Sequence, residues 1–129
     1  MRVTLKGAQM WQILTIDDDL ATLTLYAKCF AMSKVSAATS AESALRLLKR
    51  MPFDAVVCDF LLPGLTGLDF VKTCVDTHPG LPIILVTGFA DSHFHLTAAQ
   101  KGIYALVHKP TSMMGLLAVV PTRDPSGCP

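Results

Sequence analysis

Residues 54–59 read DAVVCD, an apolar run that ends at an acidic residue, Asp59. The same pattern occurs nearer the start of the chain, where residues 12–19 read QILTIDDD. Short and almost continuously apolar runs are typical of strands whose two faces are both buried in a parallel sheet. Both segments therefore predict central strands that carry carboxylates at their ends.

Outward from these two strands, apolar runs alternate with helical patterns along the chain. The expected strands are residues 12–16, 35–39, 54–59, 81–86 and 104–107, and the expected helices are residues 20–33, 41–50, 68–77, 91–101 and 112–120. A parallel strand needs a crossover helix before the next strand can pair with it. The alternation therefore predicts a doubly wound α/β fold with a five-stranded parallel sheet and helices on both faces.

The length of 129 residues is that of a single domain. We expect this domain over residues 12–120, with an N-terminal extension over residues 1–11 and a flexible tail over residues 121–129. The 11 basic residues nearly balance the 10 acidic ones and are scattered, which disfavours a nucleic-acid partner. No apolar segment reaches the ~18 residues of a membrane span, and no signal-peptide pattern opens the chain. We therefore expect a cytoplasmic protein without membrane contact.

Polar side chains follow the expected strands at the points where the strands end. They are Asp17 and Asp18 after the first strand, Asp59 at the third, Thr87 after the fourth and Lys109 after the fifth. Because the carboxyl ends of parallel strands meet at one edge of the sheet, we expect these five side chains to lie together. Clustered carboxylates repel one another unless a cation is present, and oxygen ligands without His or Cys suit Mg²⁺. A carboxylate beside Mg²⁺, a lysine and a hydroxyl is the arrangement of a phosphoryl-transfer site.

Four short motifs occur in order at these strand ends: residues 16–18, 59–67, 86–88 and 108–110. Together they resemble the receiver domains of bacterial response regulators of the chemotaxis-regulator-like kind, over roughly residues 10–120. The resemblance implies a flavodoxin-like sheet with strand order 2-1-3-4-5. It also implies a phosphoacceptor in two-component signalling rather than an enzyme, with a histidine kinase or a histidine phosphotransfer protein as the donor.

The resemblance assigns a role to each residue of the site. Asp59 is expected to take the phosphoryl group, while Thr87 and Lys109 contact it. Two backbone N–H groups, those of Phe60 and Gly88, are expected to bind phosphoryl oxygens. The expected ligands of Mg²⁺ are Asp17 (mainly through a water), Asp18, Asp59 and the backbone carbonyl of Leu61.

Three alternatives stay open. Aspartate-based, Mg²⁺-dependent phosphatases also use a strand-end aspartate, and residues 17–19 contain an Asp-x-Asp pattern, although Asp59 then has no role. A receiver used only for docking and a receiver cut from a hybrid kinase are the other two. Asp19 is expected only to cap the helix that follows it.

Two departures from the usual receiver pattern carry information. Leu106 occupies the position, three residues before the lysine, where receivers usually place Tyr or Phe, and Tyr104 stands two residues earlier. The expected last helix, residues 112–120, is apolar nearly all round, whereas a helix on a sheet needs only one apolar face. We expect part of it to be covered by a partner protein or by a second copy of the chain.

Overall fold

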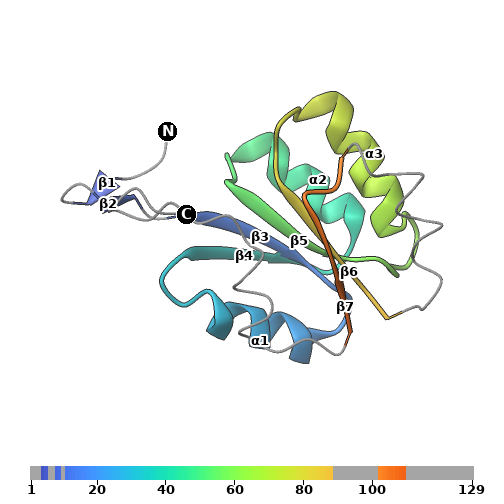
Figure 1. The fold of residues 1–129 in the computed structure, drawn as a ribbon, viewed down its shortest axis with the longest axis horizontal. Coiled ribbons are helices and arrows are strands. Elements are labelled where there is room, and N and C mark those ends of the chain that lie inside the picture. Colours follow the sequence, from blue (N-terminus) through green and yellow to red (C-terminus); the bar gives the residue numbers. More distant parts are fainter. Residues whose placement is uncertain (1–3, 6–7, 10, 89–101, 110–129) are drawn as a thin grey trace.

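The fold is built on a five-stranded parallel sheet (Figure 1). The structure, a computed structural model, describes residues 4–5, 8–9, 11–88 and 102–109. The strands of the sheet are β3 (Gln12–Ile16), β4 (Lys34–Ala38), β5 (Ala55–Asp59), β6 (Ile83–Thr87) and β7 (Ala105–His108). They lie in the order β4-β3-β5-β6-β7. The expected order 2-1-3-4-5 is therefore confirmed.

Helices cover both faces of the sheet within the described residues. Helix α1 (Leu20–Cys29) lies on one face, while α2 (Ala41–Arg50) and α3 (Gly67–Thr77) lie on the other (Figure 1). Each face has its own buried apolar cluster, which agrees with strands that are apolar on both sides. The helices expected over residues 91–101 and 112–120 and the tail expected over residues 121–129 lie outside the described residues. None of the described helices is long and apolar enough to cross a membrane.

A short hairpin precedes the sheet and was not predicted. Strands β1 (Thr4–Leu5) and β2 (Ala8–Gln9) pair with each other in antiparallel fashion, inside the segment expected to be an N-terminal extension. Figure 1 shows this pair to one side of the five-stranded sheet.

Helix α1 is shorter than predicted, and its buried face is different. It ends at Cys29 rather than at Ser33, and its buried residues are Leu23, Tyr26 and Cys29. Asp19 caps the helix as expected, because its side chain accepts a hydrogen bond from the backbone N–H of Ala21 at 3.0 Å. Leu20 follows the same helical spacing of apolar residues as Leu23 and Phe30, which predicts an inward position, but it is the first helical residue and is 69% exposed.

The loop between β5 and α3 passes very close to the end of β5. The backbone N–H of Gly67 donates to the carbonyl of Phe60 at 2.9 Å. A Cβ atom at position 67 would collide with the backbone carbonyl of Asp59 and would lie 2.9 Å from the Cα of Phe60. Only glycine allows this approach, because it has no Cβ atom.

Gly67→Ala is expected to lower the free energy of unfolding by about 1–3 kcal/mol, because the added methyl group would displace backbone rather than a flexible side chain. Chemical denaturation of the two proteins measures this difference. Gly88→Ala is the matched control, since a Cβ there would meet Lys109 at 3.8 Å, an ordinary contact. Equal stability of the two alanine variants would contradict the close approach.

Candidate functional site

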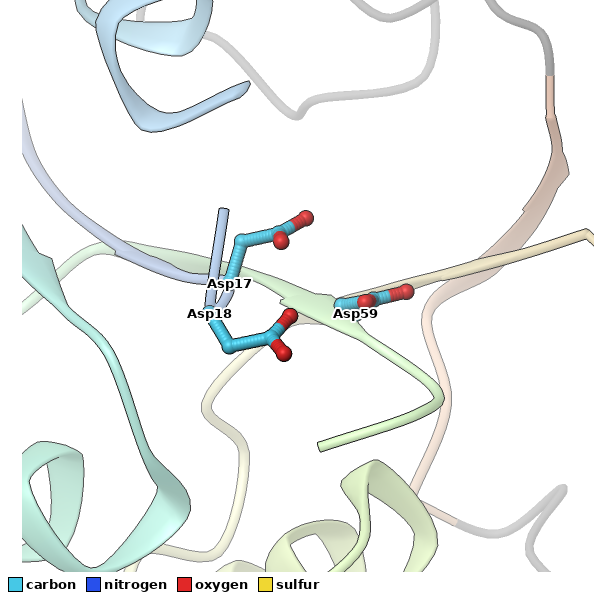
Figure 2. A group of neighbouring side chains, drawn as sticks. All are labelled: Asp17, Asp18 and Asp59. Atoms are coloured by element: carbon cyan, nitrogen blue, oxygen red, sulfur yellow. The ribbon is translucent and has the colours of Figure 1, made fainter. Parts of the chain in front are cut away.

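Three carboxylates converge at the carboxyl ends of the two central strands. Asp17 and Asp18 follow β3, and Asp59 is the last residue of β5, which pairs with β3 in parallel register. One carboxylate oxygen from each residue lies within 4.8 Å of the other two. Figure 2 shows the three side chains pointing in the same general direction from the two strand ends. Asp17 and Asp59 are buried, whereas Asp18 is exposed.

Asp17 is a buried carboxylate of which one oxygen has no hydrogen-bond partner. Its Oδ1 accepts a hydrogen bond from the backbone N–H of Asp19 at 2.9 Å, but its buried Oδ2 has no hydrogen-bond partner in the structure. Burial raises the pKa of Asp17, and the neighbouring charges of Asp59 and Asp18 raise it further, against the Asp19 N–H and Lys109, which lower it. An oxygen-only donor set with one unsatisfied buried oxygen fits a hard divalent cation such as Mg²⁺.

Asp17→Asn is expected to stabilise the cation-free protein at neutral pH, by an amount on the order of 1 kcal/mol, the usual scale of single substitutions. A carboxyl whose pKa is raised by folding holds its proton more tightly in the folded state, so ionisation costs stability as the pH rises above 3.8, its ordinary pKa. The wild type and the variant should therefore be similarly stable below that pH, and the advantage of the variant should grow above it.

Thermal unfolding as a function of pH, without Mg²⁺, measures this effect. Asp76→Asn serves as the control, because it removes an exposed carboxylate from the last turns of α3. A stability difference between the wild type and Asp17→Asn that does not change with pH would speak against the repulsive cluster.

The basic and hydroxyl groups of the site come from the next two strands. The Nζ of Lys109, directly after β7, lies 3.1 Å from Oδ1 of Asp59. Thr87 is the buried last residue of β6, and its backbone carbonyl accepts a hydrogen bond from the N–H of Lys109 at 2.7 Å. Gly88 follows and is exposed. The five strand-end side chains expected from the sequence thus lie at the same edge of the sheet.

One expected contact of the site is not supported. The backbone N–H of Phe60 donates to the carbonyl of Val86 at 2.8 Å, so it extends the ladder between β5 and β6 instead of facing an open site. The binding of a phosphoryl oxygen by this N–H therefore stays a prediction, because in this structure the N–H is already engaged by the carbonyl of Val86. Leu61, the next residue, lies in the loop and its side chain is 52% exposed.

The departure noted at position 106 persists in the structure. Leu106 is half-buried and packs against the core cluster on the α2 and α3 side of the sheet. Tyr104 precedes β7, at the opposite end of that strand from Lys109, and is 56% exposed. Neither residue places an aromatic ring in the core beside Thr87.

The periodicity of the sequence missed one residue near the site. The helical spacing of the apolar residues Leu20, Leu23 and Ala27 predicts Ala27 on the inner face of α1, but Tyr26 is buried there and Ala27 is exposed. Burial raises the pKa of Tyr26, and the charges of Asp17 and Asp59 raise it further.

The class of this protein is defined by a doubly wound α/β sheet that carries three carboxylates, a lysine and a threonine at its carboxyl edge. The chain matches the response regulator receiver domain family over residues 13–121. It is 35% identical over 78 residues to the hydrogenase transcriptional regulatory protein HoxA of Cupriavidus necator, covering 60% of this chain and 16% of HoxA. It is 31% identical over 85 residues to the response regulator protein PilR of Pseudomonas aeruginosa, covering 66% of this chain and 19% of PilR.

Solved structures agree with this assignment. A CheY-like response regulator receiver domain protein from Methanospirillum hungatei superposes with a TM-score of 0.78 at 27% identity, covering 84% of this chain and 89% of that one. The chain therefore belongs to the response regulator receiver domain family. It spans less than a fifth of the length of HoxA or PilR, so it is similar to one part of each of these proteins.

Proposed function

We propose that this receiver domain accepts a phosphoryl group on Asp59 from the phosphohistidine of a histidine kinase or a histidine phosphotransfer protein. The observation that carries the proposal is the setting of Asp59, a buried carboxylate at the end of a central strand, in an ion pair with Lys109 and within 4.8 Å of two further carboxylates. A carboxylate oxygen of Asp59 forms the new bond to phosphorus while the bond from phosphorus to the donor nitrogen breaks. The product is an aspartyl phosphate.

The other residues of the site hold the charge of the phosphoryl group. Asp18, Asp59, the backbone carbonyl of Leu61 and, mainly through a water, Asp17 would hold Mg²⁺, which would supply positive charge near the phosphoryl oxygens. The Nζ of Lys109 is already 3.1 Å from Asp59, so a small movement brings it to a phosphoryl oxygen. The Thr87 hydroxyl and the N–H of Gly88 are the remaining donors at this edge of the sheet.

The phosphorylated domain acts as a switch for protein contacts in this proposal, and not as an enzyme. A phosphoryl oxygen then takes the place of the Asp59 carboxylate oxygen as the partner of Lys109. This adds negative charge at the ends of the strands. We propose a cytoplasmic protein that reads out its state through another protein rather than through nucleic acid or membrane. The expected partner or self-association surface on residues 112–120 lies outside the described residues and stays a prediction.

Acetyl phosphate with Mg²⁺ tests the proposal against the phosphatase alternative. A receiver should gain one acid-labile phosphoryl group per chain, and free phosphate should then appear only at the rate at which that group decays. Steady, rapid release of phosphate from phosphoesters would support the aspartate-based phosphatase and overturn the proposed function.

The lifetime of the aspartyl phosphate is expected to be long, in the range of minutes to hours. In receiver domains the positions two residues after the acceptor and two after the threonine flank the path of the attacking water. In this sequence they are Leu61 and Phe89, of which Phe89 lies outside the described residues. The exposed Leu61 side chain offers no hydrogen bond that could orient this water. Leu61→Asn should therefore speed decay, by up to about 10²-fold, the lower range of what general acid–base assistance contributes.

Decay of the phosphorylated protein after removal of the donor, in Mg²⁺, measures this effect. Leu25→Asn is the matched control, because Leu25 is also an exposed leucine but lies on α1. Unchanged decay in Leu61→Asn, or decay of the wild type within seconds, would show that Leu61 does not limit the access of water.

A further inference from the structure

Asp19 stands between the acidic cluster and the first turn of α1. Its side chain caps the helix with both carboxylate oxygens. Oδ1 accepts a hydrogen bond from the backbone N–H of Ala21 at 3.0 Å, and Oδ2 accepts one from the hydroxyl of Thr22 at 2.9 Å. Its backbone is extended, with φ −97° and ψ 112°, which is the usual conformation of a residue that caps the start of a helix. The cap therefore fixes both the side chain and the main chain of Asp19.

The main chain of the same residue holds Asp17. The N–H of Asp19 donates a hydrogen bond to Oδ1 of Asp17 at 2.9 Å. The N–H of Asp17 itself donates to the carbonyl of Ala38 at 3.1 Å, so Asp17 is tied to the sheet by its main chain and to the cap of α1 by its side chain. The bond to Oδ1 leaves Oδ2, which is buried and has no hydrogen-bond partner, as the oxygen available to a cation or to its bound water.

The cap also sets the place of Asp18. This residue is exposed and lies between Asp17 and Asp19, so the direction of its side chain depends on the main chain of these two neighbours. The carboxylates of Asp17 and Asp18 are two of the three that lie within 4.8 Å of one another, whereas both oxygens of Asp19 are engaged in the cap. Asp19 therefore acts on the cluster from outside it.

We propose that Asp19 is a positioning residue of the cation site, which holds Asp17 and Asp18 in place through the cap of α1 without touching the ion. The inference rests on the proposed Mg²⁺ site and adds to it a residue that the sequence predicts only as a helix cap. Residues that hydrogen-bond to metal ligands orient them and raise the affinity for the metal. Because the coupling of two binding events is reciprocal, Mg²⁺ should also stabilise the first turn of α1.

Two substitutions separate the cap from the charge of Asp19. Asp19→Ala removes both bonds of the cap and is expected to weaken Mg²⁺ binding about tenfold, the lower range for loss of a group that supports a metal ligand. Asp19→Asn removes the charge but keeps an oxygen that can cap the helix, so it should retain most of the wild-type affinity. Calorimetric titration with Mg²⁺ at physiological ionic strength gives the three affinities.

Ser40→Ala is the matched control for lost stability. It removes the side chain that caps α2, a helix of ten residues like α1, by accepting the N–H of Ser43 at 3.1 Å. It should lower the melting temperature of the cation-free protein much as Asp19→Ala does, but leave the Mg²⁺ affinity unchanged. An equal loss of affinity in both variants would reduce the effect to general destabilisation and count against the proposal.

Hydrogen exchange in the wild type gives a second readout, which stands even if Asp19→Ala does not fold. Mg²⁺ should slow the exchange of the Ala21 amide, which bonds to Asp19, and leave that of the Ser43 amide, which bonds to Ser40, unchanged. Unchanged affinity in Asp19→Ala, equal weakening in Asp19→Ala and Asp19→Asn, or no slowing at Ala21 would overturn the role of Asp19 alone. A wild type that binds no Mg²⁺ would overturn the metal site and this role with it.

Discussion

Asp18→Ala is expected to abolish measurable Mg²⁺ binding and, with it, phosphorylation by acetyl phosphate. Asp18 is the exposed member of the carboxylate cluster, so its oxygens are open to a cation that enters from solvent. Without it the site keeps two carboxylates, one of which, Asp59, is already in an ion pair with Lys109. Too few oxygen ligands then remain for a cation that takes about six.

The loss should come from the site and not from the fold. Asp18 is not part of the buried core, and the cap of α1 is supplied by Asp19. The thermal stability of Asp18→Ala without Mg²⁺ should therefore equal or exceed that of the wild type, since one repulsive charge is gone. Calorimetric titration gives the comparison, with Asp76→Asn as an exposed control. A titration curve unchanged by Asp18→Ala would remove Asp18 from the metal site.

Asp59→Asn is expected to abolish the gain of an acid-labile phosphoryl group. The amide has nearly the size of the carboxylate but is a far weaker nucleophile, so the packing of the buried residue stays while the attack on phosphorus stops. Asp17 and Asp18 follow β3, and among the described residues it is Asp59 whose carboxylate forms an ion pair with Lys109. Intact mass before and after acid treatment measures the loss. A variant that still gains the same acid-labile mass would place the acceptor elsewhere.

Much of the fold could be predicted because its information is local. Strand β3 and helix α2 have the predicted bounds, and β5 begins one residue later than predicted. Ser40 caps α2 through a hydrogen bond from the N–H of Ser43 at 3.1 Å, which matches the expected start of that helix. The buried face of α1 was predicted less well. The spacing of apolar residues alone does not show that Leu20, at the start of the helix, is exposed to solvent.

The site could be predicted at the level of side chains, because parallel strands bring their carboxyl ends together whatever the details of packing. Asp17, Asp59 and Lys109 needed only the strand assignment. The bond from the N–H of Phe60 to the carbonyl of Val86 could not be foreseen, because it depends on the register between β5 and β6, which the sequence does not show. The close approach of Gly67 to the end of β5 and the burial of Tyr26 on α1 depend on how a loop and a helix pack against the sheet. No periodic signal reports such packing.

The most direct test of the central claim is chemical trapping of the acceptor. Borohydride reduces an aspartyl phosphate to homoserine. The wild type is treated with acetyl phosphate and Mg²⁺, reduced with borohydride and digested, so that homoserine replaces the aspartate that carried the phosphoryl group. Sequencing of the peptides by mass spectrometry should find homoserine at position 59, and none at positions 17, 18 or 54. Homoserine at one of those other positions, or at none after full treatment, would contradict Asp59 as the phosphoacceptor.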